Sequence, residues 1–169
     1  MIGLSLHALL QYLAPYEAGD RGDIADNALL QLLPAHPQYH QSIRDKALSI
    51  LSGPDAKLLF GKNSRAELPI FVYGENDLNP IQIIGRVDRT IVSNDEVLLV
   101  DFKSNATPPA SELHVSGPYL TQMGLYLRCG QKLFPEHKVS TALYWTSTQN
   151  LMMLSNELLL NTTSTFNIT

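Results

Sequence analysis

The spacing of apolar residues divides the chain into a helical first third and a remainder dominated by strands. Apolar side chains recurring every three or four residues predict helical segments over 4–13, 23–33, 38–51 and 55–60. Pro15, Pro34 and Gly53 follow the first three of these segments, where helix-ending residues are expected. The first third of the chain is therefore predicted to be helical.

From residue 65 onward, β-branched and aromatic residues predict a sheet. Strands are expected over 65–73, 81–92, 96–103, 138–145 and 151–154. Pro69 places the first strand at an edge or a bulge. A long amphipathic helix is expected over 118–133, with a core-facing stripe made of Leu120, Met123, Leu127 and Leu133. The predicted class is α/β, a mixed β-sheet flanked by helices with a helical N-terminal third.

Composition limits the classes of protein that fit this pattern. With 44% hydrophobic and 17% charged residues in 169, we expect one globular domain over 1–160, and the polar segment 161–169 is expected to be a frayed tail. No apolar run reaches the roughly 20 residues of a membrane span, so no membrane contact is expected. The single cysteine, Cys129, excludes a disulfide framework or an iron–sulfur cluster built by this chain alone, and it fits a cytoplasmic location. Cys129 itself is expected to be a buried thiol.

The candidate chemistry lies on the two strands predicted over 81–92 and 96–103. Side chains alternate along a strand, so Asp101 and Lys103 should point to one face and Phe102 to the other, into a core. Asp88 on the neighbouring strand would repel Asp101 unless a divalent cation lay between them, and Mg²⁺ prefers carboxylate and water oxygens. Such an ion, with Lys103 beside it, would suit phosphodiester hydrolysis. A short D-x-K alone is more typical of an ordinary strand end that emerges into solvent.

Four motifs in order make the pattern specific. They are G-x-x-x-H at 3–7, G-x-x-D-R at 85–89, D-F-K-S at 101–104 and Q-x-x-x-Y at 122–126. In this order the chain resembles the nuclease domain of RecB- and AddA-type helicase–nucleases, members of the PD-(D/E)xK superfamily with a restriction-endonuclease-like fold. The resemblance extends over roughly residues 3 to 154.

This resemblance implies a role for each matching residue. It makes His7, Asp88 and Asp101 metal ligands together with the backbone carbonyl of Phe102, and it makes Asp88, Asp101 and Lys103 the catalytic residues. Supporting or DNA-binding positions are implied at Gln122, Tyr126, Arg89 and, less firmly matched, Glu67. Packing remains an alternative role for Gln122 and Tyr126. The implied cofactor is Mg²⁺, with Mn²⁺ as a substitute.

The resemblance also implies a biological setting. It predicts a DNA exonuclease or endonuclease domain that processes double-strand breaks for recombinational repair in a bacterial cytoplasm, associated with the nucleoid. Helicase domains of the same polypeptide and an AddB-like subunit are the implied partners. They would supply the DNA channel that a chain of net charge −4 does not itself suggest, and the ATP site, for which the chain has no P-loop. Two alternatives stay open: a catalytically silent domain of this fold serving assembly or DNA guidance, and an acidic module that binds a small ligand.

Overall fold

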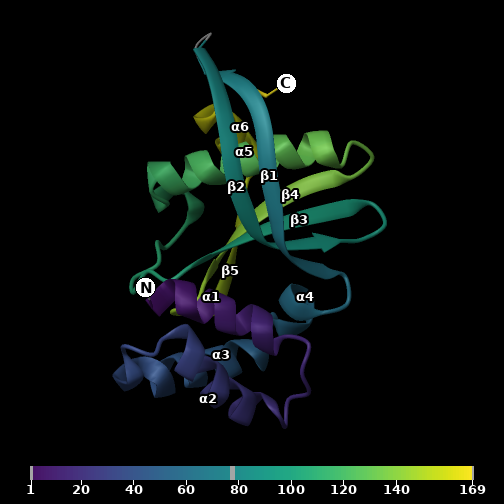
Figure 1. Ribbon diagram of the computed structural model, residues 1–169. Coiled ribbons are helices and arrows are strands. Elements are labelled where there is room, and N and C mark those ends of the chain that lie inside the picture. Colours follow the sequence, from purple (N-terminus) through teal and green to yellow (C-terminus); the bar gives the residue numbers. More distant parts are fainter. Residues whose placement is uncertain (1, 77–78, 169) are drawn as a thin grey trace. The chain divides into compact units, whose positions relative to one another are not determined.

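The computed structural model describes residues 2–76 and 79–168, which fold into two compact units (Figure 1). The first unit comprises residues 1–62 and the second residues 63–169. The boundary falls where the sequence pattern changes from helical to strand-like. A single nuclease domain over 1–160 stays a prediction.

The first unit is helical, as the apolar spacing predicts. Its elements are α1 (Ile2–Leu13), α2 (Arg21–Leu32), the 3₁₀ helix η1 (Pro37–Tyr39), α3 (His40–Leu51) and α4 (Ala56–Phe60). Helices α1, α2 and α3 pack against one another and bury leucines such as Leu9 and Leu29. Arg21 ties the ends of these helices together, because its guanidinium donates to the backbone carbonyls of Ala14 and Leu51.

The second unit is a curled mixed sheet with helices. Its strands are β1 (Ser64–Asn76), β2 (Asn79–Val92), β3 (Glu96–Lys103), β4 (Lys138–Trp145), β5 (Asn150–Leu154) and β6 (Phe166–Ile168). Within the described residues these six strands form one sheet in the order β5-β4-β3-β2-β1-β6. Neighbours are antiparallel except β3 and β4, which are parallel and are joined through η2 (Glu112–His114) and α5 (Gly117–Leu133). The long β1–β2 hairpin bends away from the other strands (Figure 1).

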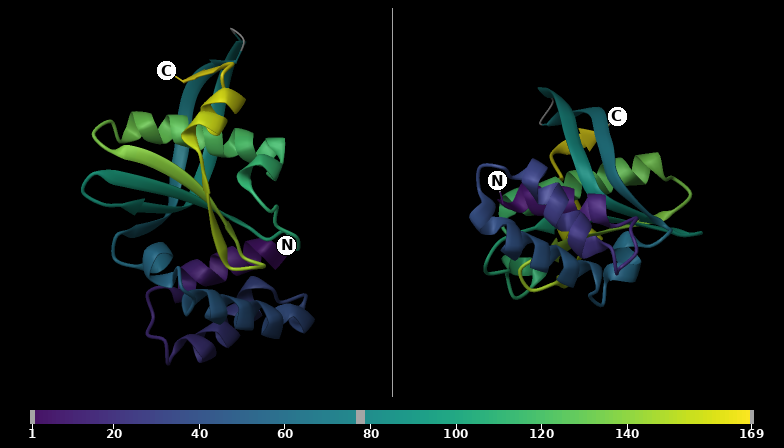
Figure 2. Two further views of the ribbon diagram at one scale, coloured as in Figure 1. Left: turned by 180° about the vertical axis from the view of Figure 1, so that it is seen from behind. Right: turned by 60° about the horizontal axis from the view of Figure 1, so that its bottom comes forward.

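Helix α5 lies against one face of this sheet, with α6 (Asn156–Thr162) beside it (Figure 2). Met123 and Leu127 of α5 pack with Leu99 and Leu143 of the central strands in one core. The predicted core stripe is wrong at Leu133, which is exposed because it lies in the last turn of α5.

The end of the chain differs from the frayed tail expected for 161–169. Residues 161–162 complete α6, and β6 pairs with Gly74–Asn76 of β1. Leu159 and Ile168 are buried in the core of the sheet unit. Ile168, together with Leu159 just before the segment, thus anchors a stretch whose Asn, Thr and Ser content is typical of loops.

Pro69 lies on an open stretch of β1. The described pairing of β1 with β6 covers Gly74–Asn76, while its pairing with β2 includes Pro69 opposite Arg86. Strand β1 lies between β2 and β6 in the sheet order, so the predicted edge applies only to this stretch, where proline lacks the N–H that a strand on its other side would need. In 2–76 and 79–168, none of the helices combines the length and apolarity required to cross a membrane.

Candidate active site

Asp88 and Asp101 lie where β2 and β3 separate. The β2–β3 ladder runs from Val92 opposite Val97 to Arg89 opposite Val100, and the two aspartates follow directly on their strands. Beyond the ladder, the Phe102 N–H donates to Asp88 Oδ2 over 2.7 Å. A side-chain carboxylate therefore takes the place of a strand carbonyl and is held beside the Asp101–Phe102 peptide.

Strand β3 presents its charged residues to α5, as the alternation predicts. Asp101 and Lys103 share the face of Leu99, which packs in the core with α5. Phe102 points to the opposite face, where its ring lies 5.4 Å from that of Tyr144. Strand β3 thus places a carboxylate and an ammonium group together on the face that packs against α5.

Asp101, Lys103 and Gln122 form a closed ring of polar contacts. Lys103 Nζ lies 2.7 Å from Asp101 Oδ2 and donates to Gln122 Oε1 over 2.8 Å. Gln122 Nε2 in turn donates to Asp101 Oδ1 over 3.1 Å. The Lys103 and Asp101 side chains are only 13% and 7% exposed, so water screens their attraction weakly. Gln122 fixes both charged groups.

Tyr126 connects the polar contacts of Asp101, Lys103 and Gln122 to β2. Its hydroxyl accepts from Gln122 Nε2, donates to the Arg86 carbonyl and accepts from the Arg86 N–H. Burial is the main cause that raises the pKa of Tyr126, so the phenol is neutral and can donate. The structure therefore places Gln122 and Tyr126 in contact with the candidate site, and a role in touching DNA stays a prediction.

Gly85 provides the space that Tyr126 occupies. A Cβ on Gly85 would lie 2.9 Å from Tyr126 Cε1 and 3.0 Å from its hydroxyl oxygen. The glycine of the second motif and the tyrosine of the fourth therefore pack directly against each other.

Gly85→Ala is expected to displace the Tyr126 ring and loosen Gln122, because the added methyl overlaps the ring edge. We expect the free energy of unfolding to fall by about 1–3 kcal/mol, as for other overpacked sites. Chemical denaturation measures this loss. Gly19→Ala is the control, since a Cβ there meets nothing within 4 Å; equal stability of both variants would contradict the packing role.

The β1–β2 hairpin turns over near Glu67 and Asp88. On either side of this level, opposite faces of the hairpin pack against α5. Val87 is part of the hydrophobic core beneath α5, and Val92 packs against the same core. Strict alternation along β2 would put these two residues on opposite faces. At this level Glu67 has φ 54°, and the described register passes from Ala66–Arg89 to Leu68–Val87. A left-handed residue that is not glycine is a local strain of the kind found at functional sites.

Two acids, Glu67 and Asp88, lie at the level of this irregularity and influence each other electrostatically. Burial is the main cause that raises the pKa of Asp88; the Phe102 N–H, Lys103 and Arg89 oppose the rise, and Glu67 adds to it. The Glu67 carboxylate pairs with Arg86 Nη1 at 2.9 Å on the exposed side of the hairpin. Glu67 is therefore near enough to influence Asp88 electrostatically.

Arg89 lies on the other face of the sheet from Asp101. It stands opposite Val100, which alternates with Leu99 and Asp101. Burial lowers the pKa of Arg89 to about 10, and Asp88 and Glu67 act against that shift, so the guanidinium stays charged at neutral pH. Arg89 thus supplies positive charge behind the carboxylates.

Two residues that contact the site were not assigned a role from the sequence. Arg86 holds Tyr126 through its backbone and Glu67 through its side chain. Tyr119 lies under Lys103, whose Nζ is 4.2 Å from the ring centroid. The signal for Tyr119 was its position three residues before Gln122, which places both on one helical face with Tyr126.

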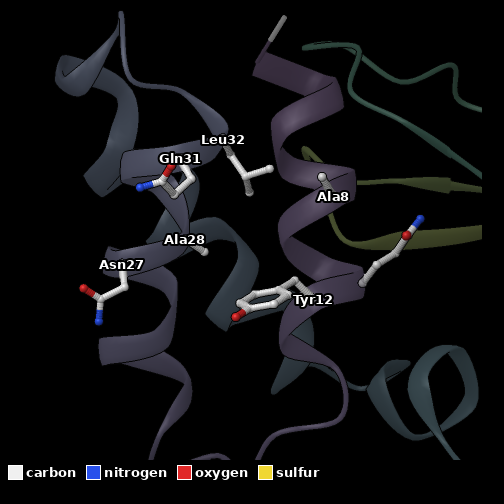
Figure 3. A pocket seen from close by; sticks show the side chains of 7 residues that line it. Ala8, Tyr12, Asn27, Ala28, Gln31 and Leu32 are labelled. Atoms are coloured by element: carbon white, nitrogen blue, oxygen red, sulfur yellow. The ribbon is translucent and has the colours of Figure 1, made fainter.

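The first motif lies in the helical unit. His7 is half-buried on α1, and its role as a metal ligand stays a prediction. The same unit contains a hollow of about 660 Å³ between α1 and α2, lined by side chains such as Tyr12, Asn27 and Gln31 (Figure 3). The described residues that line it are uncharged.

Cys129 is buried in α5, and burial raises the pKa of its thiol to about 11. Since the thiolate is the reactive form, we expect alkylation of the folded chain by iodoacetamide at pH 8 to be at least about a hundred-fold slower than that of the unfolded chain. Mass spectrometry of the alkylated protein measures both rates. Equal rates would contradict a buried thiol with a raised pKa.

Comparison with known proteins identifies the family. The model for the PD-(D/E)XK nuclease superfamily matches residues 1–157. The chain belongs to this superfamily. The curled mixed sheet flanked by helices is consistent with the restriction-endonuclease-like fold of that superfamily, so the predicted fold class is confirmed.

Two solved structures are similar to this superfamily member. The crystal structure of SSO0001 is 15% identical, with 78% of this chain and 68% of that chain covered and a TM-score of 0.38. The crystal structure of a protein named "Putative exonuclease", from Eubacterium rectale, is 13% identical, with 86% of this chain and 60% of that chain covered and a TM-score of 0.47. The chain therefore spans less than two thirds of the second protein. No curated protein sequence matches it.

PD-(D/E)XK nucleases typically use divalent metals, and the donors present here fit one class of ion. Among residues 2–76 and 79–168, no group of three or more His, Cys, Asp or Glu side chains is placed to hold a metal. The site instead offers the carboxylates of Asp88 and Asp101 beside the Phe102 backbone. Mg²⁺ is commonly held by one or two carboxylates completed by water and substrate phosphate, whereas structural zinc needs four protein ligands. The donor set therefore fits Mg²⁺.

Proposed function

We propose that this PD-(D/E)XK chain is a Mg²⁺-dependent deoxyribonuclease domain that hydrolyses phosphodiester bonds. The observation that carries the proposal is the closed ring of Asp101, Lys103 and Gln122, extended by Tyr126 and placed next to Asp88. Carboxylates for a metal and a fixed cation for a phosphate meet here in one place. An ordinary strand end would leave its D-x-K in solvent.

Asp88, Asp101 and the Phe102 carbonyl would hold the ion, and His7 would complete the set proposed from the motif order. When bound, Mg²⁺ would offset charge on the phosphate and lower the pKa of a water. Lys103 would place an ammonium next to the phosphate as negative charge grows on its oxygens. Gln122 would keep Lys103 and Asp101 oriented, and Tyr126 would keep Gln122 in place.

We further propose that the domain serves a RecB/AddA-type helicase–nuclease in a bacterial cytoplasm, acting in double-strand break repair. The four motifs in their order support this role. Helicase domains of the same polypeptide and an AddB-like subunit would supply the basic DNA channel. That extra surface would explain how a chain with net charge −4 engages a polyanion.

Cleavage assays on labelled single-stranded DNA and RNA test the enzymatic proposal. We expect the 169-residue chain to cut DNA with Mg²⁺ or Mn²⁺, and EDTA to stop it. Cleavage in EDTA would contradict metal dependence, and preference for RNA would contradict a deoxyribonuclease. The helicase–nuclease role is tested by ATP-driven degradation of duplex DNA by the full-length protein, in which Asp101→Asn should stop degradation and spare unwinding.

A further inference from the structure

A hollow next to Lys103 has no role in the function proposed so far. Its volume is about 330 Å³, and its walls include Asn105, Pro108, Pro109, His114, Tyr119 and Trp145. These residues come from the loop after β3, the segment before α5, the first turn of α5 and the end of β4. We propose that the hollow binds one nucleobase of the single strand being cleaved. This inference rests on the proposed function and deepens it.

The hollow shares a wall with the candidate active site. Lys103 Nζ contacts Asp101 and Gln122 and also lies over the Tyr119 ring. A ligand that contacts Tyr119 in the hollow is therefore one side chain away from the ammonium proposed to meet the phosphate. A nucleotide has the same arrangement, since a planar base and a phosphate are joined through one sugar.

The chemistry of the walls suits a base better than a phosphate or a cation. None of the described residues that line the hollow is an Asp, Glu, Lys or Arg, and its surfaces are aromatic rings and prolines with polar groups from Asn105 and His114. Aromatic side chains stack on the π-face of any base, which gives binding without strict sequence preference. The volume lies at the low end for small-ligand sites, which matches one base rather than a duplex.

The aromatic wall is already positioned. Tyr119 donates its hydroxyl hydrogen to Asn105 Oδ1 over 3.0 Å, and its ring centroid lies 6.3 Å from that of Trp145. Trp145 is 1% exposed, and its Nε1 has no hydrogen-bond partner among the described residues. Because Trp145 is buried, Tyr119 provides the aromatic face on which a base would stack in the hollow.

Trp145 is the only tryptophan of the chain, so its fluorescence reports on this hollow. The test is a titration of the 169-residue chain with a short thymidine oligonucleotide in EDTA, so that no cleavage occurs. We expect a saturable change in Trp145 fluorescence. An oligonucleotide of the same length made only of abasic residues should bind at least about ten-fold more weakly, given the usual strength of base stacking on aromatic residues.

Equal binding of the abasic oligonucleotide would overturn the proposal, and so would the absence of any fluorescence change. Thymidine monophosphate should bind more weakly than the oligonucleotide; tighter binding would assign the hollow to free nucleotides and contradict a strand site. Tyr119→Ala should remove the preference for bases, and Tyr119→Phe should keep it. Tyr73→Ala, at an exposed tyrosine of the same unit, is the matched control.

The two proposals fail separately. A base-dependent fluorescence change without DNA cleavage in Mg²⁺ would leave the base site standing and contradict the nuclease function. Cleavage without any base dependence would do the reverse. The comparison of normal and abasic strands on the unaltered chain decides the question even if Tyr119→Ala does not fold.

Discussion

Lys103→Gln is expected to slow DNA cleavage by about a hundred- to a thousand-fold, the usual effect of removing one group that stabilises transition-state charge. The glutamine amide can still donate to Asp101 or Gln122, so the ring of polar contacts loses its charge rather than every hydrogen bond. Single-turnover cleavage with saturating Mg²⁺ measures the effect on chemistry. Thermal unfolding shows whether the fold persists.

Lys138→Gln is the matched control for Lys103→Gln. Lys138 also pairs with a carboxylate, Glu96 at 3.2 Å, but the two side chains are 72% and 63% exposed. Such exposed pairs contribute little, so neither stability nor cleavage should change. A Lys103→Gln protein that cuts as fast as Lys138→Gln would exclude Lys103 from the chemistry.

Asp88→Asn is expected to abolish cleavage and at the same time to stabilise the fold. Burial raises the pKa of Asp88 and so makes its ionised form unfavourable in the folded chain at neutral pH. Asparagine keeps an oxygen that can accept from the Phe102 N–H but carries no charge. We expect a gain of roughly 0.5–2 kcal/mol in the free energy of unfolding, typical when a destabilised functional position is relieved.

The pH dependence of that gain has a definite sign. A raised folded-state pKa means that the folded chain binds more protons than the unfolded chain between the two pKa values, so stability falls as pH rises through this window. Below the ordinary pKa of an aspartate, Asp88 is protonated in both states and the penalty is absent. The advantage of Asp88→Asn should therefore be full at neutral pH and vanish in acid.

Denaturant unfolding at several pH values measures this difference. Asp45→Asn is the control, since Asp45 forms an exposed pair with Arg44 and should show no such trend. An advantage of Asp88→Asn that persists unchanged into acid would mean that charge at Asp88 is not its source.

The parts of the site that sequence could predict follow from periodicity. Strand alternation alone places Asp101 and Lys103 on one face and Phe102 on the other, and helical spacing places Gln122 and Tyr126 together. These rules hold within one element. The structure adds which elements meet, and so shows that Tyr126 fills the space above Gly85.

Other features could not be predicted because they depend on contacts between distant segments. The switch of faces between Val87 and Val92 follows a left-handed residue at Glu67, and no glycine or asparagine marks that position. Strand β6 forms because Ile168 finds a buried place beside β1, although its neighbours have the composition of a loop. Local secondary-structure propensity predicts neither the change of face nor strand β6.

The measurement that tests the central claim most directly is cleavage of labelled single-stranded DNA by the chain and by Asp101→Asn, each with Mg²⁺. Glu96→Gln, at the exposed start of the same strand, is the control. If Asp101 belongs to the metal and phosphate site, the unaltered chain and Glu96→Gln cut the DNA and Asp101→Asn does not. Full activity of a folded Asp101→Asn protein would contradict the site.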